Sequence, residues 1–228
     1  MNRRMARPSA TLAAAAALAT VLCGCVATPT PDSTPAPGTE AMTNTSRHPL
    51  SERSLALGPA STALLQAELF HSEDARTVYV RYRLRNDGAE QALAVFDRGL
   101  YGERAGAVYA PGPVGQARIE IETGGSVTLA HIAVPPPSDD TRRQQAPLVL
   151  ELAPGAELND ESITQLPEHV TPTRLRWCIG VAAFDRSAYD TPTDTPRGRI
   201  WVGGAAAVVA QQRLCTAWYD VASRQFLD

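Results

Sequence analysis

The stretch Thr77-Val-Tyr-Val-Arg-Tyr-Arg-Leu-Arg85 decides the fold class of this chain. Two sets of side chains alternate along it: Val78, Val80, Tyr82 and Leu84 on one face, and Tyr79, Arg81, Arg83 and Arg85 on the other. A period of two with β-branched and aromatic residues predicts a half-buried strand that has one apolar and one solvated face. Asn86-Asp87-Gly88 then supplies turn residues, and residues 92–96 are the expected return strand.

The same signals recur on both sides of this stretch. Residues 118–122 alternate, two glycines follow, and residues 126–134 complete a second predicted hairpin. Further predicted strands are residues 64–71, 148–152, 175–184 and 214–219. Many short strands without a long amphipathic helix predict an all-β domain, an antiparallel β-sandwich of immunoglobulin-like type.

Three segments give weaker signals. The Ala- and Gln-rich residues 205–212 suit a strand or a helix equally well. Residues 135–145 and 185–197 are expected to form surface loops, because they are rich in Pro, Asp and Thr.

Composition narrows the classes of function. The 228 residues are 44% apolar and 20% charged, and all 21 basic residues are Arg. Without Lys, the chain has no P-loop lysine, Schiff base or Lys general base. If residues 1–24 are removed, 18 basic and 24 acidic side chains leave a net charge of −6. This charge disfavours nucleic acids and anionic membrane surfaces as partners.

Residues 1–25 carry the parts of an export signal. Three arginines precede residue 8, and an apolar run of about 11 residues extends over 12–22. The run is too short for a membrane-spanning helix, which needs about 20 residues.

The end of this leader, Leu22-Cys23-Gly24-Cys25, resembles the lipobox of bacterial lipoprotein precursors. The resemblance implies cleavage after Gly24 and lipidation of Cys25. Because Val26 stands where an Asp would retain the protein in the inner membrane, it also implies the periplasmic leaflet of a Gram-negative outer membrane. An ordinary secretory signal that ends at Ala27 is the alternative.

The segment after the leader predicts the domain organisation. Residues 26–60 contain six prolines among Thr, Ser, Ala and Gly, without apolar periodicity. A segment of this composition buries too little apolar surface to offset the conformational entropy that it would lose on ordering. The expected organisation is a signal peptide over 1–24, a lipidated cysteine with a Pro/Thr-rich linker over 25–60, and one β domain over 61–228.

Two cysteines remain for the exported domain. Cys178 and Cys215 lie in predicted strands, and an oxidising compartment favours a disulfide between them. A nucleophilic cysteine, as in sortase-like transpeptidases, is the alternative.

The four histidines give no metal-ligand spacing, so we expect no metal site and no cofactor. His131 is expected to be a partly buried, hydrogen-bonded strand residue, and His71 to begin a polar turn. No nucleophile elbow is present, so no catalytic residue is predicted. Trp177 alternates with apolar residues and is expected in the core rather than in a sugar-stacking platform with Trp201 and Trp218.

The arginine row, defined as Arg81, Arg83 and Arg85, is the candidate binding face. On one strand face these guanidinium groups stand about 6.6 Å apart and suit carboxylate or phosphate ligands. The favoured interpretation of the row is nevertheless a solvated salt ladder, with Glu120 and Glu122 as partners from a neighbouring strand, and the binding face is the alternative.

The sequence therefore predicts a non-enzymatic envelope lipoprotein, attached to the membrane through Cys25, that binds a protein or another envelope component. A periplasmic inhibitor or immunity protein is a second hypothesis. A hydrolase of the envelope that uses His131 or His169 is a third, and it requires one of these histidines within hydrogen-bond reach of a Ser, a Cys or a carboxylate.

Overall fold

The computed structural model describes residues 49–58, 60–103, 106, 109, 112–113, 116–135 and 146–227. The predicted leader with Cys25, the linker up to residue 48 and most of the predicted loop over 135–145 lie outside these residues. Thr45–Asp228 form one compact unit. No helix in the described part of the chain has the length and apolar character needed to cross a membrane.

The first sheet, called sheet A, contains the strand that decides the fold. Its order is β1-β2-β3-β8, and all neighbours are antiparallel. The bounds are β1 Leu50–Ala56, β2 Thr62–Ser72, β3 Thr77–Asn86 and β8 Glu157–Gln165. The alternation predicted for β3 is confirmed, because Val78, Val80, Tyr82 and Leu84 are buried while Tyr79, Arg81 and Arg83 are exposed.

The second sheet, sheet B, is built around β9. Its main order is β10-β11-β7-β4-β9-β13-β14; β12 and β6 also pair with β9, and β5 pairs with β6. Its strands are β4 Leu93–Val95, β5 Arg118–Ile121, β6 Ser126–His131, β7 Leu148–Leu152, β9 Arg174–Ala183, β10 Thr193–Thr195, β11 Gly198–Val202, β12 Gln212–Cys215, β13 Tyr219–Asp220 and β14 Gln225–Phe226. Because β6 runs parallel to β9, the prediction of a purely antiparallel domain is wrong in this one pairing.

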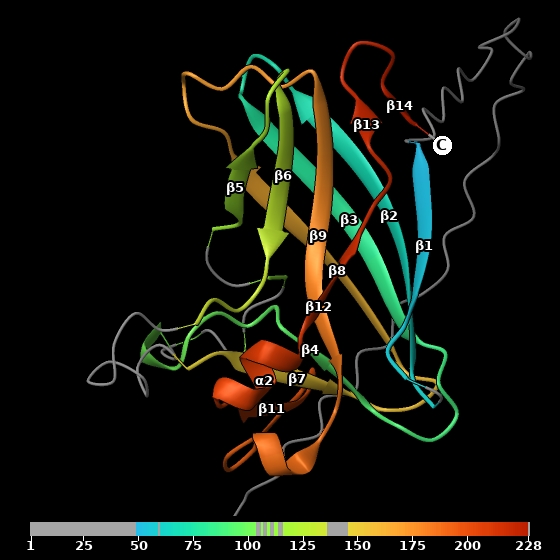
Figure 1. The fold of residues 1–228 in the computed structure, drawn as a ribbon. Coiled ribbons are helices and arrows are strands. Elements are labelled where there is room, and N and C mark those ends of the chain that lie inside the picture. The colour runs from blue at the N-terminus through green and yellow to red at the C-terminus, as the bar shows by residue number, and fades with distance from the viewer. Residues whose placement is uncertain are drawn as a thin grey trace, which may run out of the picture. The chain divides into compact units, whose positions relative to one another are not determined.

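Both sheets contribute to one core. Figure 1 shows β9 crossing in front of β3 and β8, and the main cluster of buried side chains draws on all three strands. Trp177 of β9 is fully buried, as predicted, and its ring centroid lies 4.5 Å from that of Tyr82 in β3. A smaller cluster around Trp201 packs beside helix α2, Ala205–Ala210, so the ambiguous segment begins as a helix. Short 3-10 helices occupy Tyr101–Glu103 (η1) and Arg186–Ala188 (η3).

The predicted hairpin from β3 to residues 92–96 is not formed. The second strand, β4, pairs with β7 and β9 in sheet B instead. The cause is Asn86, whose buried amide donates to the carbonyls of Gln91 and Leu152, while its Oδ1 accepts from the backbone of Gly88. These bonds turn the chain from one sheet to the other. The second predicted hairpin, β5 with β6, is confirmed.

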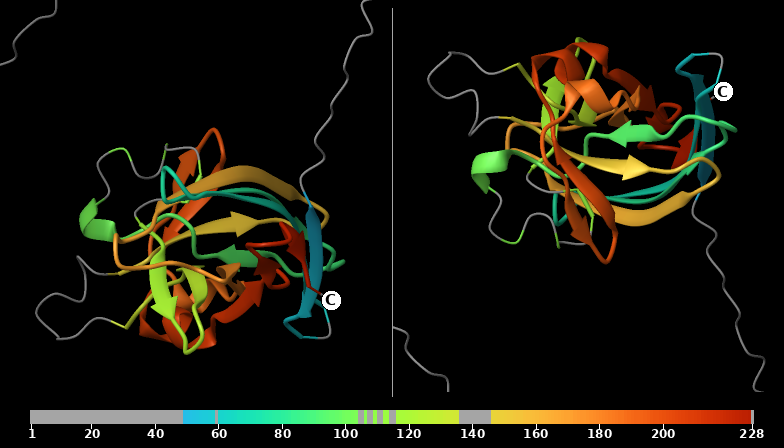
Figure 2. Two further views of the ribbon diagram at one scale, coloured as in Figure 1. Left: turned by 90° about the horizontal axis from the view of Figure 1, so that it is seen from above. Right: turned by 90° about the horizontal axis from the view of Figure 1, so that it is seen from below.

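The predicted linker ends earlier than residue 60, because Leu50–Ala56 pair with β2 along their whole length as β1. Ser51 is buried and its Oγ accepts from the backbone of Ala217 at 2.9 Å. In Figure 1 and in both views of Figure 2 the C-terminal end of the chain lies beside β1. Tertiary contacts therefore order a segment whose composition gives no strand signal.

Other departures from the sequence predictions are local. The expected loop over 185–197 contains η3 and β10, and the strand expected over 214–219 is divided into β12 and β13. Between them, Thr216 exchanges hydrogen bonds with the backbone of Trp177. β8 was not predicted, because three of its inward-facing side chains, those of Asp160, Ser162 and Thr164, are polar.

The predicted disulfide is present. Cys178 of β9 and Cys215 of β12 stand directly opposite each other and are joined, with a sequence separation of 37. Cys178 alternates with the core residues Trp177 and Ile179, so the bridge lies on the side of β9 that faces away from the main core.

Candidate functional site

The outer face of sheet A carries three large apolar side chains in one line. Phe70 of β2 stands opposite Tyr79 of β3, and Tyr79 stands opposite Ile163 of β8. Their exposed fractions are 39%, 41% and 63%, and the rings of Phe70 and Tyr79 are 6.0 Å apart. We call these three residues the apolar row.

A charged row follows in the next register position. Glu68, Arg81 and Glu161 face one another across the same three strands. Arg81 Nη1 lies 3.7 Å from Glu68 Oε2, and both side chains stay well exposed. The two rows line a shallow hollow of about 490 Å³. An exposed apolar patch with a polar rim is typical of a surface that binds another molecule.

The arginine row belongs to this face. Arg81 borders the hollow, whereas Arg83 pairs with Glu157 and Arg85 Nε lies 2.5 Å from Asp87 Oδ1. The predicted partners are wrong: Glu120 binds Arg213 and Arg118, and Glu122 binds Arg176. The reason is that the glutamates lie on or directly after β5 of sheet B, while the arginine row lies in sheet A. Arg83 and Arg85 thus form part of a local salt ladder.

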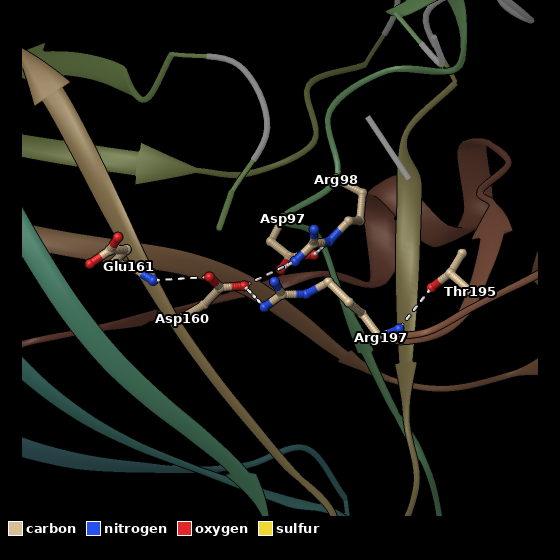
Figure 3. Close-up of polar contacts among 6 residues, drawn as sticks. All are labelled: Asp97, Arg98, Asp160, Glu161, Thr195 and Arg197. Atoms are coloured by element: carbon tan, nitrogen blue, oxygen red, sulfur yellow. Dashed lines mark hydrogen bonds and ion pairs between the residues drawn. The ribbon is translucent and has the colours of Figure 1, made fainter. Parts of the chain in front are cut away.

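A buried ionic cluster lies around Asp160, whose side chain points to the opposite side of β8 from Glu161 (Figure 3). Arg98 Nε and Nη2 donate to the two carboxylate oxygens of Asp97 at 3.1 and 2.8 Å, and Nη2 lies 3.4 Å from Asp160 Oδ2. Arg197, in the turn between β10 and β11, donates to the same Asp160 oxygen. The side chains of Asp97 and Arg98 are fully buried, and Asp160 is 4% exposed.

Burial governs the titration of this cluster. Burial raises the pKa of the Asp97 carboxyl, and Arg98 only partly opposes this effect. Burial alone would lower the pKa of the Arg98 guanidinium, because it disfavours the charged form. The adjacent Asp97 carboxylate outweighs this effect and raises the pKa of Arg98. Burial, assisted by Asp97 and Asp160, raises the pKa of Tyr82 well above its usual value. The cluster joins Asp160 of sheet A to Arg98 and Arg197, which flank strands of sheet B, so its evident role is to hold the sheets together.

His131 is buried and hydrogen-bonded, as predicted. Its Nε2 lies 3.0 Å from Ser162 Oγ of β8, and each residue is 6% exposed. Burial lowers the pKa of His131 to about 4, so the imidazole is neutral at neutral pH. A general base works best when its pKa lies near the operating pH, which this imidazole does not satisfy. His169 is exposed. His71 lies within β2, which ends at Ser72, so the polar turn begins after Ser72 and not at His71 as predicted.

Within the described ranges, no group of three or more His, Cys, Asp or Glu side chains is placed to hold a metal ion. The three tryptophans do not share a platform: Trp177 and Trp201 are buried, and the half-buried Trp218 lies under the Arg176 guanidinium at 4.3 Å.

Sequence reasoning found the arginine row but missed the apolar row. The missed signal is Tyr79, an aromatic residue on the face that the arginines mark as solvated. Comparison of the chain with protein-family models, with curated proteins and with solved structures finds no match in any of the three.

Proposed function

We propose that this protein is an exported, non-enzymatic lipoprotein, anchored through Cys25 in the periplasmic leaflet of the outer membrane, that binds an envelope component. The leader and the lipobox-like Leu22-Cys23-Gly24-Cys25 support the anchor. Acyl chains bind a membrane at about 0.8 kcal/mol per buried methylene, so two or three of them make a durable attachment. Removal of residues 1–24 and gain of lipid mass on Cys25, measured by intact mass, test this part.

For the fold, we propose a two-layer β-sandwich. The inward side chains of β2, β3 and β8 and those of β6, β7 and β9 belong to one buried cluster, which is how two stacked sheets share a core. Exclusion of solvent between the sheets leaves the outer faces as the surfaces open to partners.

The observation that carries the binding role is the apolar row. Phe70, Tyr79 and Ile163 expose large apolar groups side by side, although the inner face of the same strands is fully used by the core. Single exposed apolar residues are common on protein surfaces, but a contiguous row beside a hollow is not required by the fold. A partner surface that covers this row accounts for it.

Capture from solubilised envelopes tests the proposal. The wild-type lipoprotein is compared with a Phe70→Ser/Ile163→Ser variant and with Ile121→Ser, which removes a side chain 55% exposed on β5 of sheet B. We expect the double variant to lose a partner that the wild type and the control both retain. Identical captured proteins in all three samples would contradict the binding role of sheet A.

If the protein is an inhibitor or immunity protein, the outer face of sheet A would bind an enzyme. If the captured partner is an enzyme whose activity falls on binding, this more specific role is selected.

The contact between His131 and Ser162 favours one alternative, the hydrolase. A serine hydrolase would label at Ser162 with a fluorophosphonate probe, and Ser162→Ala would abolish the labelling. We expect no labelling of the native protein, because both side chains are buried and the imidazole is a weak base.

A further inference from the structure

We propose that the hollow on the outer face of sheet A takes an extended protein segment bearing a large apolar side chain and, two residues along, an Arg or Lys. This inference rests on the binding role proposed above and names the chemistry of the partner.

The apolar half of the motif follows from the apolar row. Strands in a sheet stand about 4.8 Å apart, so three residues in register across β2, β3 and β8 form an apolar strip about 10 Å wide. Phe70 and Tyr79 supply ring surfaces at one end, and Ile163, the most exposed of the three, supplies an aliphatic end. One large apolar side chain of a partner can lie across this strip.

The basic half follows from the charged row, which holds two carboxylates and one guanidinium. Both acids stand opposite Arg81, but among the described residues only Glu68 forms an ion pair with it, at 3.7 Å. The exposed Glu161 side chain has no ion-pair partner among the described residues. The row therefore carries a net negative charge on a domain that is itself acidic, and a cation on the partner complements it.

The spacing of the two rows sets the spacing of the motif. Tyr79 and Arg81 are two residues apart on one strand face, which is about 6.6 Å. An extended partner segment presents side chains i and i+2 to one side at the same interval. An apolar residue over the apolar row thus brings a basic residue at i+2 over Glu68 and Glu161.

Selection from a library of random linear peptides tests the motif. The probe is a display library of octapeptides, panned against the immobilised full-length lipoprotein in detergent, with Phe70→Ser/Ile163→Ser as the counter-selection target. We expect enriched peptides to pair a large apolar residue with Arg or Lys at i+2. Enrichment of apolar peptides without a basic preference overturns the inference while leaving the binding role in place, and equal enrichment on both targets overturns the binding role itself.

Charge reversal gives the sharper test. The variant Glu68→Arg/Glu161→Arg retains the apolar row and turns the charged row positive. We expect enrichment of basic peptides to fall by about tenfold and acidic residues to replace them at i+2. If the reversed variant still selects Arg or Lys, the inference is wrong. A thermal melt of each variant verifies the fold, and Glu161→Gln, expected to weaken the basic preference without reversing it, serves if the double variant does not fold.

Another occupant of the hollow would give a different result. A second copy of this chain would produce a concentration-dependent dimer in sedimentation analysis, dissociated by Ile163→Asp. That result overturns the assignment to a separate partner segment, and a monomer at all concentrations supports it.

Discussion

The outer faces of the two sheets differ in how many of their polar side chains are paired by hydrogen bonds or ion pairs within the same face. On sheet B, Arg213 makes two hydrogen bonds to Glu120 at 2.7 and 2.9 Å, and Arg176 binds Thr128 and covers Trp218. On sheet A, the apolar row is open to solvent and Glu161 has no ion pair within the described chain. The difference is therefore local: sheet A exposes three apolar side chains side by side next to an acid without an ion pair, whereas the exposed Ile121 of sheet B lies beside charged side chains that bond to one another.

This contrast depends on the two sheets being fixed to each other, so that changes on one face act only on that face. The buried ionic cluster and the contact between His131 and Ser162 make this connection from the interior.

The largest effect is expected for Arg98→Met. The substitution leaves the carboxylate of Asp97 buried without its two hydrogen bonds, and breaking a buried pair from one side costs about 3–5 kcal/mol. The double variant Asp97→Asn/Arg98→Met should recover part of this loss, because no buried charge is left uncompensated. Chemical denaturation measures both. A single variant as stable as the wild type would show that the cluster does not hold the sheets together.

Removal of the disulfide is expected to follow in size. Cys178→Ala should lower the free energy of unfolding by about 2–5 kcal/mol, because the bridge between β9 and β12 restricts the unfolded chain. Reduction of the wild-type protein should give the same loss, and reduction should not change the variant further. Free alkylation of Cys178 and Cys215 in the native protein would instead reopen the nucleophile hypothesis.

Acid should destabilise the protein through His131. Burial lowers the pKa of this imidazole from 6.5 to about 4, so the unfolded chain binds a proton that the folded chain refuses between these two values. The contribution of neutral His131 to the free energy of unfolding is fully present above pH 6.5. It is lost as the pH falls towards 4, by about 3 kcal/mol in total. Between pH 6.5 and 4, the free energy of unfolding should change less steeply with pH in His131→Gln than in the wild type. Equal slopes in the two proteins would contradict the argument from burial.

The smallest effect on stability is expected for the arginine row. Arg81, Arg83 and Arg85 are exposed ion-pair members, and such pairs contribute little in water. The triple Arg→Gln variant should melt almost where the wild type does and should retain its partner, because the partner cation meets the glutamates. Loss of capture with an unchanged melting temperature would identify the row as the recognition site for an acidic partner.

Most strands with a clear apolar pattern were predicted from the sequence, although β11 with its buried Ile200 and Trp201 was not. Residues 77–85 alternate and residues 148–152 are apolar except at Glu151, and both segments were predicted as strands. β8 was missed because the inward-facing side chains of Asp160 and Ser162 are polar, and they bind Arg98 and His131. Its absence from the prediction also hid Ile163, without which the apolar row cannot be seen.

Local pattern could not reveal contacts made across long sequence separations. Ser51 is ordered by Ala217, and Asn86 redirects the chain through a bond to Leu152. The disulfide was predicted because the proposed leader and lipidation site account for the other two cysteines, which leaves Cys178 and Cys215 to pair; this is an argument from chemistry and not from pattern.

The most direct test of the central claim compares two surface variants in one capture experiment. Phe70→Ser/Ile163→Ser changes the open face of sheet A, and Ile121→Ser changes an exposed position on sheet B. Because all three positions are partly or largely exposed, we expect both variants to melt close to the wild type. The account predicts that only the sheet A variant loses its partner. Loss of the partner in the sheet B variant, or its retention in the sheet A variant, would contradict the account.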